Sequence, residues 1–182
     1  MSADNQQERL LLESNFGYYI AGFTDGEGSF NVSIKKRKDY VNEWKLSASF
    51  NISQKDRVIL TRIKDVLGCG TLRERKDGVT YYEVTDIKSL TEKIIPFFRK
   101  FTILSEKKSK NFSIFAQIVM LMKQKTHLTE YGMRKILELR ETLNEGRGRK
   151  RKYNLLDCMP VEESPETTRK LPIRLKKRMS TV

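Results

Sequence analysis

Two acidic residues, Asp25 and Glu27, stand among three glycines in the stretch IAGFTDGEGSF at residues 20–30. Carboxylate oxygens are the ligands that hard divalent cations prefer, so this pair could contribute to a metal site in a basic protein. Taken alone, the string also fits a helix cap and a tight turn without any chemistry. The remainder of the sequence has to separate these two interpretations.

The glycines indicate how the carboxylates would be positioned. Apolar residues recur at helical spacing through residues 10–25, which predicts a helix, with Ser14 or Asn15 able to cap it partway along. Glycine costs a helix interior about 1 kcal/mol relative to alanine, so Gly22 and Gly26 need another reason. Small residues at this spacing let a second helix approach closely. If that helix belongs to a second subunit, a two-fold axis brings two copies of the carboxylates together.

The charge balance predicts a polyanionic partner. Lys and Arg total 36 against 23 Asp and Glu, a formal net charge of +13. A surplus of this size favours association with nucleic acid. The 182 residues suit one domain with a full core. We expect an N-terminal extension at residues 1–13, a folded domain at 14–150 and a basic, flexible C-terminal tail at 151–182.

Several classes of site and location are disfavoured. The single histidine, His127, cannot form a two-histidine metal centre, and Cys69 and Cys158 have no CxxC or histidine neighbour that would complete a ligand set. No uncharged apolar run reaches the roughly 18 residues of a membrane span, and the first residues carry no apolar signal core. We therefore expect a soluble intracellular protein without a targeting signal or a membrane partner.

Alternation of polar and apolar residues predicts four strands. The first two cover residues 29–35 and 45–52, and two more flank the Asp-Gly pair at 77–78, which is typical of a tight hairpin turn. A helix is expected at 53–68, with Ser53 as its N-cap and Gly68 at its end. Further helices are expected at 89–101, 111–125 and 129–146, the last capped by Thr129 and ended by Gly146. This order predicts the α+β class with a mixed or antiparallel sheet.

The outward positions of the strands would share one polar, net basic face. Arg can pair with guanine, Asn with adenine and Glu with cytosine, so a mixed set suits base readout. The lysine-rich hairpin tip beside this face would contact phosphates, or would only solubilise the chain. The candidate DNA-binding residues are Ser29, Asn31, Ser33, Lys35, Lys36, Arg37, Lys38, Lys45, Ser47, Ser49, Asn51, Thr71, Arg73, Arg75, Tyr81, Glu83 and Thr85.

The string IAGFTDGEG resembles the LAGLIDADG motif of homing endonucleases, with Gly26 at the second small position and Glu27 at the second acid. Downstream, SFNISQKDRVIL, IKDVLGCGTL, the lysine pair in LSEKKSKNF and HLTEYGMRKILELRETLNEG are similar to blocks of single-motif members. The resemblance covers roughly residues 16–150. It implies an αββαββα core with a saddle-shaped sheet in the DNA major groove, and a homodimer formed through the motif helices.

The resemblance also implies roles for particular residues. Glu27 and the Gly26 carbonyl would bind Mg²⁺, with Ca²⁺ bound without cleavage and Mn²⁺ as a substitute. Gln54 would order active-site water and Arg57 would contact phosphate. The active-site lysine matches Lys107 or Lys108. The implied dimer interface comprises Tyr18, Ala21, Gly22, Thr24 and Asp25, with Asp25 capping or bracing the partner helix and Thr24 polar where an apolar residue is usual.

The function implied by the resemblance is that of an intron-encoded, site-specific DNA endonuclease. It would act on a long near-palindromic duplex as a homodimer, in a bacterial cytoplasm or in the organelle whose genome encodes it. A second hypothesis is a non-cleaving binder on the same scaffold, either an RNA maturase with intron RNA as its partner or a DNA-binding regulator. A generic basic RNA-binding domain is the third, and it would not depend on Glu27.

Overall fold

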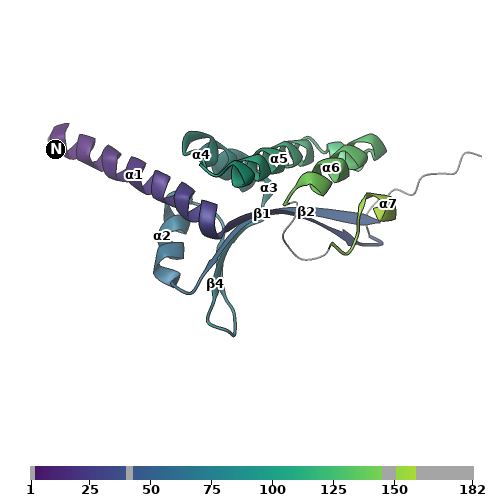
Figure 1. Cartoon of the computed structure of the whole chain (residues 1–182), viewed down its shortest axis with the longest axis horizontal. Coiled ribbons are helices and arrows are strands. Elements are labelled where there is room, and N and C mark those ends of the chain that lie inside the picture. Colours follow the sequence, from purple (N-terminus) through teal and green to yellow (C-terminus); the bar gives the residue numbers. More distant parts are fainter. Residues whose placement is uncertain (1–2, 40–42, 145–150, 159–182) are drawn as a thin grey trace, which may run out of the picture.

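A computed structural model describes residues 3–39, 43–144 and 151–158 of the chain. Its element order, helix, two strands, helix, two strands and then helices, is the order expected from the periodicity (Figure 1). The first half contains α1 (Ala3–Glu27), β1 (Gly28–Lys36), β2 (Trp44–Gln54), α2 (Arg57–Leu67), β3 (Thr71–Glu74) and β4 (Thr80–Val84). The second half contains α3 (Ile87–Ser89), η1 (Leu90–Ile94), α4 (Ile95–Lys100), α5 (Glu106–Lys123), η2 (Thr126–Leu128), α6 (Glu130–Thr142) and α7 (Leu155–Cys158). None of the described helices is both long enough and apolar enough to span a bilayer.

The four strands form one antiparallel sheet in the order β1-β2-β4-β3. In the long ribbon of β1 and β2, Gly28 lies opposite Ile52 and Lys36 lies opposite Trp44. Because Gly28 follows directly on the last residue of α1, the sheet begins where the motif helix ends. The acidic end of the motif is therefore placed at one end of the strand ribbon.

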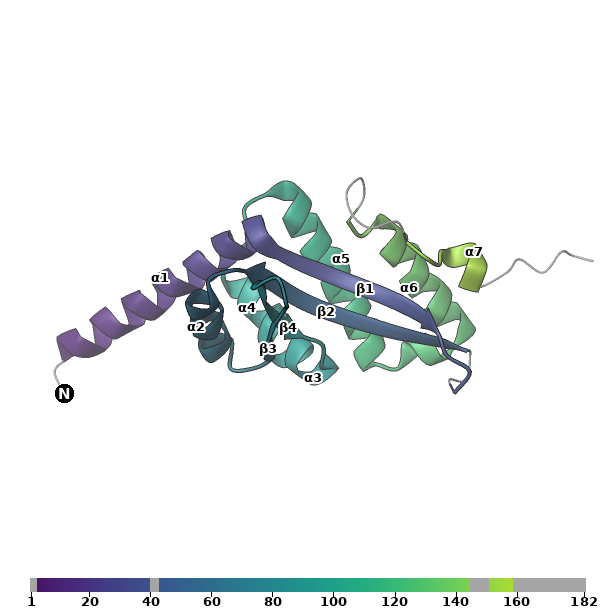
Figure 2. The same cartoon turned by 90° about the horizontal axis from the view of Figure 1, so that it is seen from below.

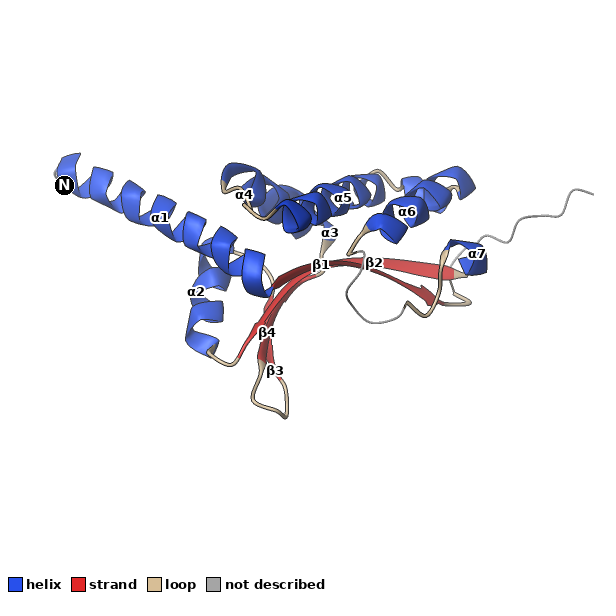
Figure 3. Cartoon of the chain, in the orientation of Figure 1, coloured by secondary structure: helices blue, strands red, loops and turns tan. Residues whose placement is uncertain are grey.

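Helices cover one face of the sheet and leave the other open. Phe30, Phe50 and Tyr82 are each at most 1% exposed and point to the covered face. There the ring of Phe98 in α4 packs edge-on against Phe30 and Phe50, with centroids 5.6 and 5.2 Å apart. Burial of each such side chain contributes roughly 1.5–3 kcal/mol. Figure 3 shows α3 to α6 on one side of a curved sheet, and Figure 2 views the strands from the open, concave side.

The ends of the first and last long helices differ from the sequence expectation. α1 begins at Ala3 and continues through Ser14 and Asn15, so neither residue caps it. α6 starts as expected, because Thr129 Oγ1 accepts a hydrogen bond from the Gly132 N–H at 3.1 Å. The prediction of its end was wrong, since α6 stops at Thr142. The expected terminator at position 146 lies outside the described residues.

The helix between the two strand pairs also starts differently. Its N-cap is Asp56, whose carboxylate accepts a hydrogen bond from the Val58 N–H at 2.8 Å. The prediction of Ser53 as the cap was wrong, because Ser53 is still part of β2 and pairs with Tyr81 of β4. The predicted end was right, since Gly68 closes α2 in the left-handed conformation with φ of 62°.

Residues 151–158, where the expected tail starts, contact the domain. The ring of Tyr153 lies edge-on to Trp44 of β2, with centroids 5.0 Å apart. Arg151 binds the Glu141 carboxylate at 2.7 Å and donates to the Leu143 carbonyl oxygen at 2.5 Å. Arg151 also donates to the Glu141 carbonyl oxygen at 3.1 Å, so it satisfies a carbonyl group in the last turn of α6 and the one that follows the helix. The rest of the expected tail, residues 159–182, lies outside the described part of the chain.

Candidate active site and nucleic-acid interface

Glu27 is the last residue of α1, and its side chain is exposed. Its carboxylate has no hydrogen-bond or ion-pair partner among the described residues, which leaves its oxygens available to a ligand. A side chain at the neighbouring Gly26 would meet nothing within 4 Å. No cluster of three or more His, Cys, Asp or Glu side chains suited to a metal occurs in the part of the chain that is described. The predicted metal site therefore depends on Glu27 and the Gly26 carbonyl.

Asp25 has a different role from Glu27 within the chain. Its carboxylate accepts hydrogen bonds from the backbone N–H of Ser105, at 3.0 Å, and from the Ser105 hydroxyl. Ser105 is the residue immediately before α5. Asp25 thus ties the end of the motif helix to the start of α5 in the same subunit, while its expected contact with a partner helix stays a prediction.

The structure brings Lys108, rather than Lys107, to the acidic end of the motif. Lys108 is half-buried, and its Nζ donates a hydrogen bond to the Gly28 carbonyl oxygen at 2.5 Å. Burial lowers the pKa of Lys108, while the nearby carboxylates of Asp25 and Glu27 oppose that fall. Lys107 is exposed. Lys108 is therefore the better candidate for the active-site lysine.

Gln54 and Arg57 are the other two candidates for catalysis. Gln54 is the last residue of β2, and Arg57 is the first residue of α2. Gln54 is two residues beyond Ile52, the partner of Gly28, and its Oε1 accepts a hydrogen bond from the Lys55 N–H at 2.8 Å. Arg57 is exposed and forms an ion pair with Glu74 of β3 at 3.3 Å. Arg57 is thus directed toward β3 rather than toward the motif.

The glycines of the motif fall into two groups. Added side chains at Gly22 and Gly26 would meet open space, whereas a Cβ at Gly28 would stand 2.5 Å from Thr24 Cγ2. Gly28 is therefore required by packing within the chain, and the other two leave an open stripe on α1. Tyr18, 59% exposed, continues that stripe.

Two of the expected interface residues lie on the other side of the motif helix. Ala21 and Thr24 are 2% and 0% exposed within their own chain. The Thr24 hydroxyl is buried without a hydrogen-bond partner among the described residues. A second helix docked on the open stripe would therefore meet Gly22 and Gly26 rather than these two side chains.

The candidate DNA-binding residues of the strands share the concave face, as the alternation indicated. The register places Asn31 opposite Ser49, and Asn51 opposite both Ser29 and Glu83. Further cross-strand pairs on this face are Ser33 with Ser47, Lys35 with Lys45, Ser53 with Tyr81, Thr71 with Glu83 and Arg73 with Tyr81. Arg75 and Thr85 follow the ends of β3 and β4. This is the side that no helix covers (Figure 2).

The two halves of this face differ in how their polar groups are used. On β1 and β2, the side chains of Ser29, Asn31 and Asn51 have no hydrogen-bond partner among the described residues. On the β3–β4 hairpin, Arg73 binds Glu83 at 2.6 Å, and Arg75 donates to the Tyr81 hydroxyl at 2.6 Å. The ribbon therefore offers free groups to a ligand, whereas these two hairpin arginines would have to exchange partners.

The hairpin tip between β1 and β2 carries paired charges. Lys36 lies 3.5 Å from the Glu43 carboxylate, and Arg37 binds Asp39 at 2.7 Å. The hydrogen bond from Arg37 lowers the pKa of Asp39 to about 2. Lys38 is exposed. The tip therefore combines cations with acids, which reduces its net attraction for phosphate.

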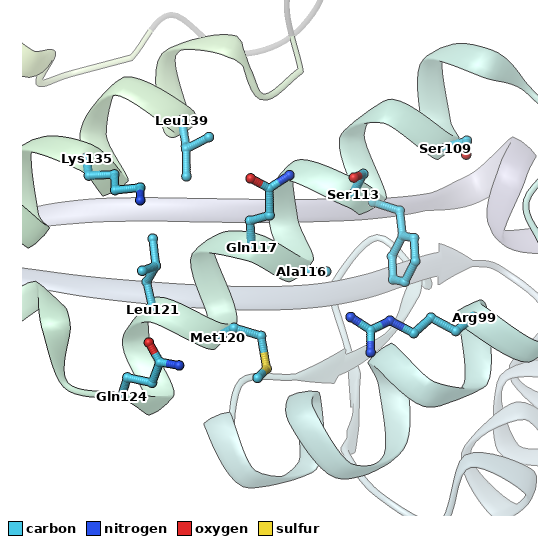
Figure 4. Close-up of a pocket in the computed structure, with 11 residues that line it drawn as sticks. Arg99, Ser109, Ser113, Ala116, Gln117, Met120, Leu121, Gln124, Lys135 and Leu139 are labelled. Carbon is cyan, nitrogen blue, oxygen red and sulfur yellow. The ribbon is translucent and has the colours of Figure 1, made fainter.

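Two hollows of the described surface lie away from Glu27. One of about 720 Å³ has Phe16, Phe97 and Phe101 in its lining, between α1, α2 and α4. The other, about 460 Å³, lies on the helical layer, where Arg99 and Lys135 stand on opposite walls (Figure 4). Neither lining contains an Asp or Glu side chain among the described residues, so neither hollow offers an acid beside a base. The acidic motif instead opens onto an exposed surface.

Comparison with known proteins identifies relatives over most of the chain. A family model described as LAGLIDADG endonuclease matches residues 20–119. A probable intron-encoded endonuclease of Neurospora crassa is 37% identical over 148 residues, which are 79% of this chain and 32% of the relative. The homing endonuclease I-ApeII of Aeropyrum pernix is 28% identical over 167 residues, which are 87% of this chain and 96% of that protein. The chain thus spans about a third of the fungal relative and nearly all of the archaeal one.

Solved structures give the same result for the fold. An archaeal intron-encoded homing endonuclease complexed with DNA, I-Vdi141I, is 32% identical, with a TM-score of 0.75 over 80% of this chain and 93% of that one. I-SmaMI, bound to an uncleaved DNA target in the presence of calcium ions, is 29% identical, with a TM-score of 0.71 over 80% of this chain and 49% of that one. These likenesses confirm the expected fold. With the family model matching more than half of its residues, this chain belongs to the LAGLIDADG endonuclease family.

Proposed function

We propose that the chain is a site-specific DNA endonuclease that cuts one phosphodiester in each strand of a long near-palindromic duplex. The observation that carries this proposal is the position of Glu27 at the end of the concave polar face and near Lys108, with an exposed carboxylate that no described residue binds. Binding on that face would bring a duplex backbone to the acid. We expect the protein to act in the compartment whose genome carries the target.

A homodimer follows from one acidic motif per chain and two strands to cut. The open stripe of Gly22 and Gly26 supports docking of the same helix from a second copy, because no described residue fills the space beside those glycines. A two-fold axis through this contact would bring two Glu27 side chains together and repeat the reading face along the duplex. The near-palindromic target is the DNA counterpart of that symmetry.

The donor groups at the motif fit a hard divalent cation. Glu27 offers a carboxylate that has no partner among the described residues, and the carbonyl oxygen of the preceding Gly26 would be a second oxygen ligand. Mg²⁺ held there would neutralise charge on the phosphate and lower the pKa of a bound water. We expect Ca²⁺ to bind without supporting cleavage and Mn²⁺ to substitute for Mg²⁺.

The remaining candidates would act on the phosphate and on water. Lys108, held at the Gly28 carbonyl, would place a cation where negative charge develops on the phosphate. Gln54 would orient water, using an amide that now only accepts from Lys55. Arg57 would bind a phosphate after releasing Glu74, and an exposed ion pair of this kind is weak enough to exchange.

Sequence readout would come mainly from the ribbon of β1 and β2. Asn31 and Asn51 have free amides suited to adenine, and the serines beside them can act through water. Arg73, which is paired with Glu83, would read guanine only if that pair opens. We expect these residues to set the preferred target and the cations around them to set affinity.

The test is selection of cut sites from a pooled duplex library. The library would contain near-palindromic sequences and intron-lacking gene fragments, incubated with Mg²⁺ or with Ca²⁺. Discrete double-strand cuts with Mg²⁺ alone, at sites of two-fold symmetry, are the expected result. Retention of nucleic acid without any cut would instead favour a non-cleaving maturase or regulator, and selection on intron RNA would separate those two.

A further inference from the structure

The outer edge of β1 is closed by side chains. β1 is an edge strand, paired only with β2, so its outward carbonyl groups have no strand partner. Three alternate carbonyl oxygens, those of Gly28, Phe30 and Val32, each accept a side-chain hydrogen bond instead. The donors are, in the same order, Lys108 Nζ at 2.5 Å, Asn144 Nδ2 at 2.8 Å and Arg140 Nε at 3.0 Å.

The second of these donors also binds the helix that carries Lys108. Asn144 and Asn111 form a reciprocal pair, in which the Asn144 N–H donates to Asn111 Oδ1 and Asn111 Nδ2 donates to Asn144 Oδ1, both at 3.0 Å. Asn111 is 7% exposed. It lies three residues after Lys108, on the same face of α5. The pair therefore links α5 to β1 two residues along from the carbonyl that Lys108 binds.

Lys108 lies midway between two anchors of α5. Three residues before it, Ser105 is bound by the Asp25 carboxylate. Three residues after it, Asn111 is bound by Asn144, which reaches the Phe30 carbonyl of β1. Each anchor ties α5 to the motif helix or to the strand that follows it.

The backbone at Asn144 is fixed in the conformation that this contact needs. Its φ is 58°, in the left-handed region that asparagine tolerates better than most residues. The buried Arg140, 5% exposed, holds the preceding turn of α6 to the Val32 carbonyl. The Asn144 amide is thus presented to β1 by a well-anchored helix end.

We propose that Asn144, acting through Asn111, is a positioning residue that holds Lys108 beside Glu27. The effect of Asn144 on catalysis rests on the proposed nuclease function. The side-chain hydrogen bonds of Asn144 go to Asn111 and to the Phe30 carbonyl rather than to Glu27 or Lys108, so its effect on the reaction passes through the docking of α5 on β1. A displacement of about 1 Å can slow an enzyme on the order of 100-fold.

The first test measures the position of Lys108 without using cleavage. An amine-acetylating reagent labels the folded protein, and mass spectrometry gives the ratio of Lys108 to Lys107 labelling, with the exposed neighbour as internal reference. In the wild type this ratio is low, because Lys108 is half-buried and bound to the Gly28 carbonyl. Asn144→Gly keeps the left-handed backbone and removes the amide, so the ratio should rise toward that of an exposed lysine.

The second test is a double-mutant cycle on single-turnover cleavage of the selected duplex. Asn144→Gly should lower the rate on the order of 10- to 100-fold and should have no further effect in a Lys108→Met background. If Asn144 only stabilised the fold, Asn144→Gly would lower the cleavage rate equally in the wild-type and Lys108→Met proteins. It would then weaken DNA binding as well. Thr142→Ala, which removes a hydroxyl that donates to the Leu139 carbonyl in the same helix end, is the matched control and should change neither readout.

Asn144→Asp provides a second variant if the glycine variant does not fold. It keeps the side-chain acceptor for Asn111 but sets a carboxylate oxygen against the Phe30 carbonyl in place of the donor, so a change in the same direction is expected. An unchanged labelling ratio in a folded variant would overturn the proposal, and so would equal rate losses in the two backgrounds. If the ratio rises but the wild type cuts no duplex, the positioning contact stands while the nuclease assignment and its catalytic consequence fail.

Discussion

Replacing the buried Thr24 by valine should stabilise the folded chain. Thr24 is 0% exposed, and its hydroxyl has no hydrogen-bond partner among the described residues. Burial of an unpaired hydroxyl costs about 1–3 kcal/mol in mutational series. Valine has nearly the same shape, keeps the methyl group that packs against Gly28 and removes the unpaired group. We expect a gain of about 1–2 kcal/mol in the free energy of unfolding, or about 2–4 °C in Tm for each kcal/mol.

Urea unfolding followed by circular dichroism measures this change, and the chain supplies a matched control. Thr91 is also buried, at 9% exposure, but its hydroxyl donates to the Ile87 carbonyl oxygen at 2.9 Å. Thr91→Val should therefore be neutral or destabilising, since it removes a satisfied hydrogen bond. A clear loss of stability in Thr24→Val would contradict this expectation, because it would indicate that the Thr24 hydroxyl has a hydrogen-bond partner.

Three further predictions concern the motif and the core. Gly28→Ala should destabilise the fold by about 2 kcal/mol in urea titration, because the added Cβ would stand 2.5 Å from Thr24 Cγ2 and 2.7 Å from its carbonyl oxygen. Gly22→Leu should not lower the stability of the single chain, since that space is open, but sedimentation should show dimers converted to monomers. The ordinary pKa of a tyrosine side chain is 10.0, and burial raises the pKa of Tyr82 above this value in the folded state. The free energy of unfolding should therefore fall as the pH rises above 10.0. The phenol then ionises more readily once unfolded, so Tyr82→Phe should flatten the fall.

The sheet and its faces could be predicted from the sequence because their signals are local. Alternation along β1 and β2 gave both the buried set, such as Phe30 and Phe50, and the polar face that carries Asn31 and Asn51. Gly68 and Thr129 likewise marked helix ends by their residue type alone.

Features that depend on distant contacts could not be predicted in this way. Ser53 has the character of a cap, but pairing with β4 keeps it in the sheet and leaves capping to Asp56. The choice between Lys107 and Lys108 required the packing of α5 on β1, which determines which of two adjacent side chains reaches the Gly28 carbonyl.

The closed edge of β1 is the clearest case of a feature hidden from the sequence. Arg140 and Asn144 bind carbonyl groups more than 100 residues earlier in the chain, at Val32 and Phe30. Within the helical pattern Arg140 is one charged residue among several, and no periodicity distinguishes a buried arginine from an exposed one. Only the placement of α6 against the strand edge reveals its partner.

The role of Glu27 is tested by comparing wild type and Glu27→Gln on the selected duplex, for cleavage with Mg²⁺ and for binding with Ca²⁺. The substitution removes a charge but barely changes volume, and Glu27 has no partner within the described chain whose loss would disturb the fold. We expect a loss of cleavage on the order of 1000-fold or more, with binding unchanged or tighter. Cleavage at the wild-type rate, or equal loss of binding and cleavage, would contradict the assignment of Glu27 as the catalytic acid.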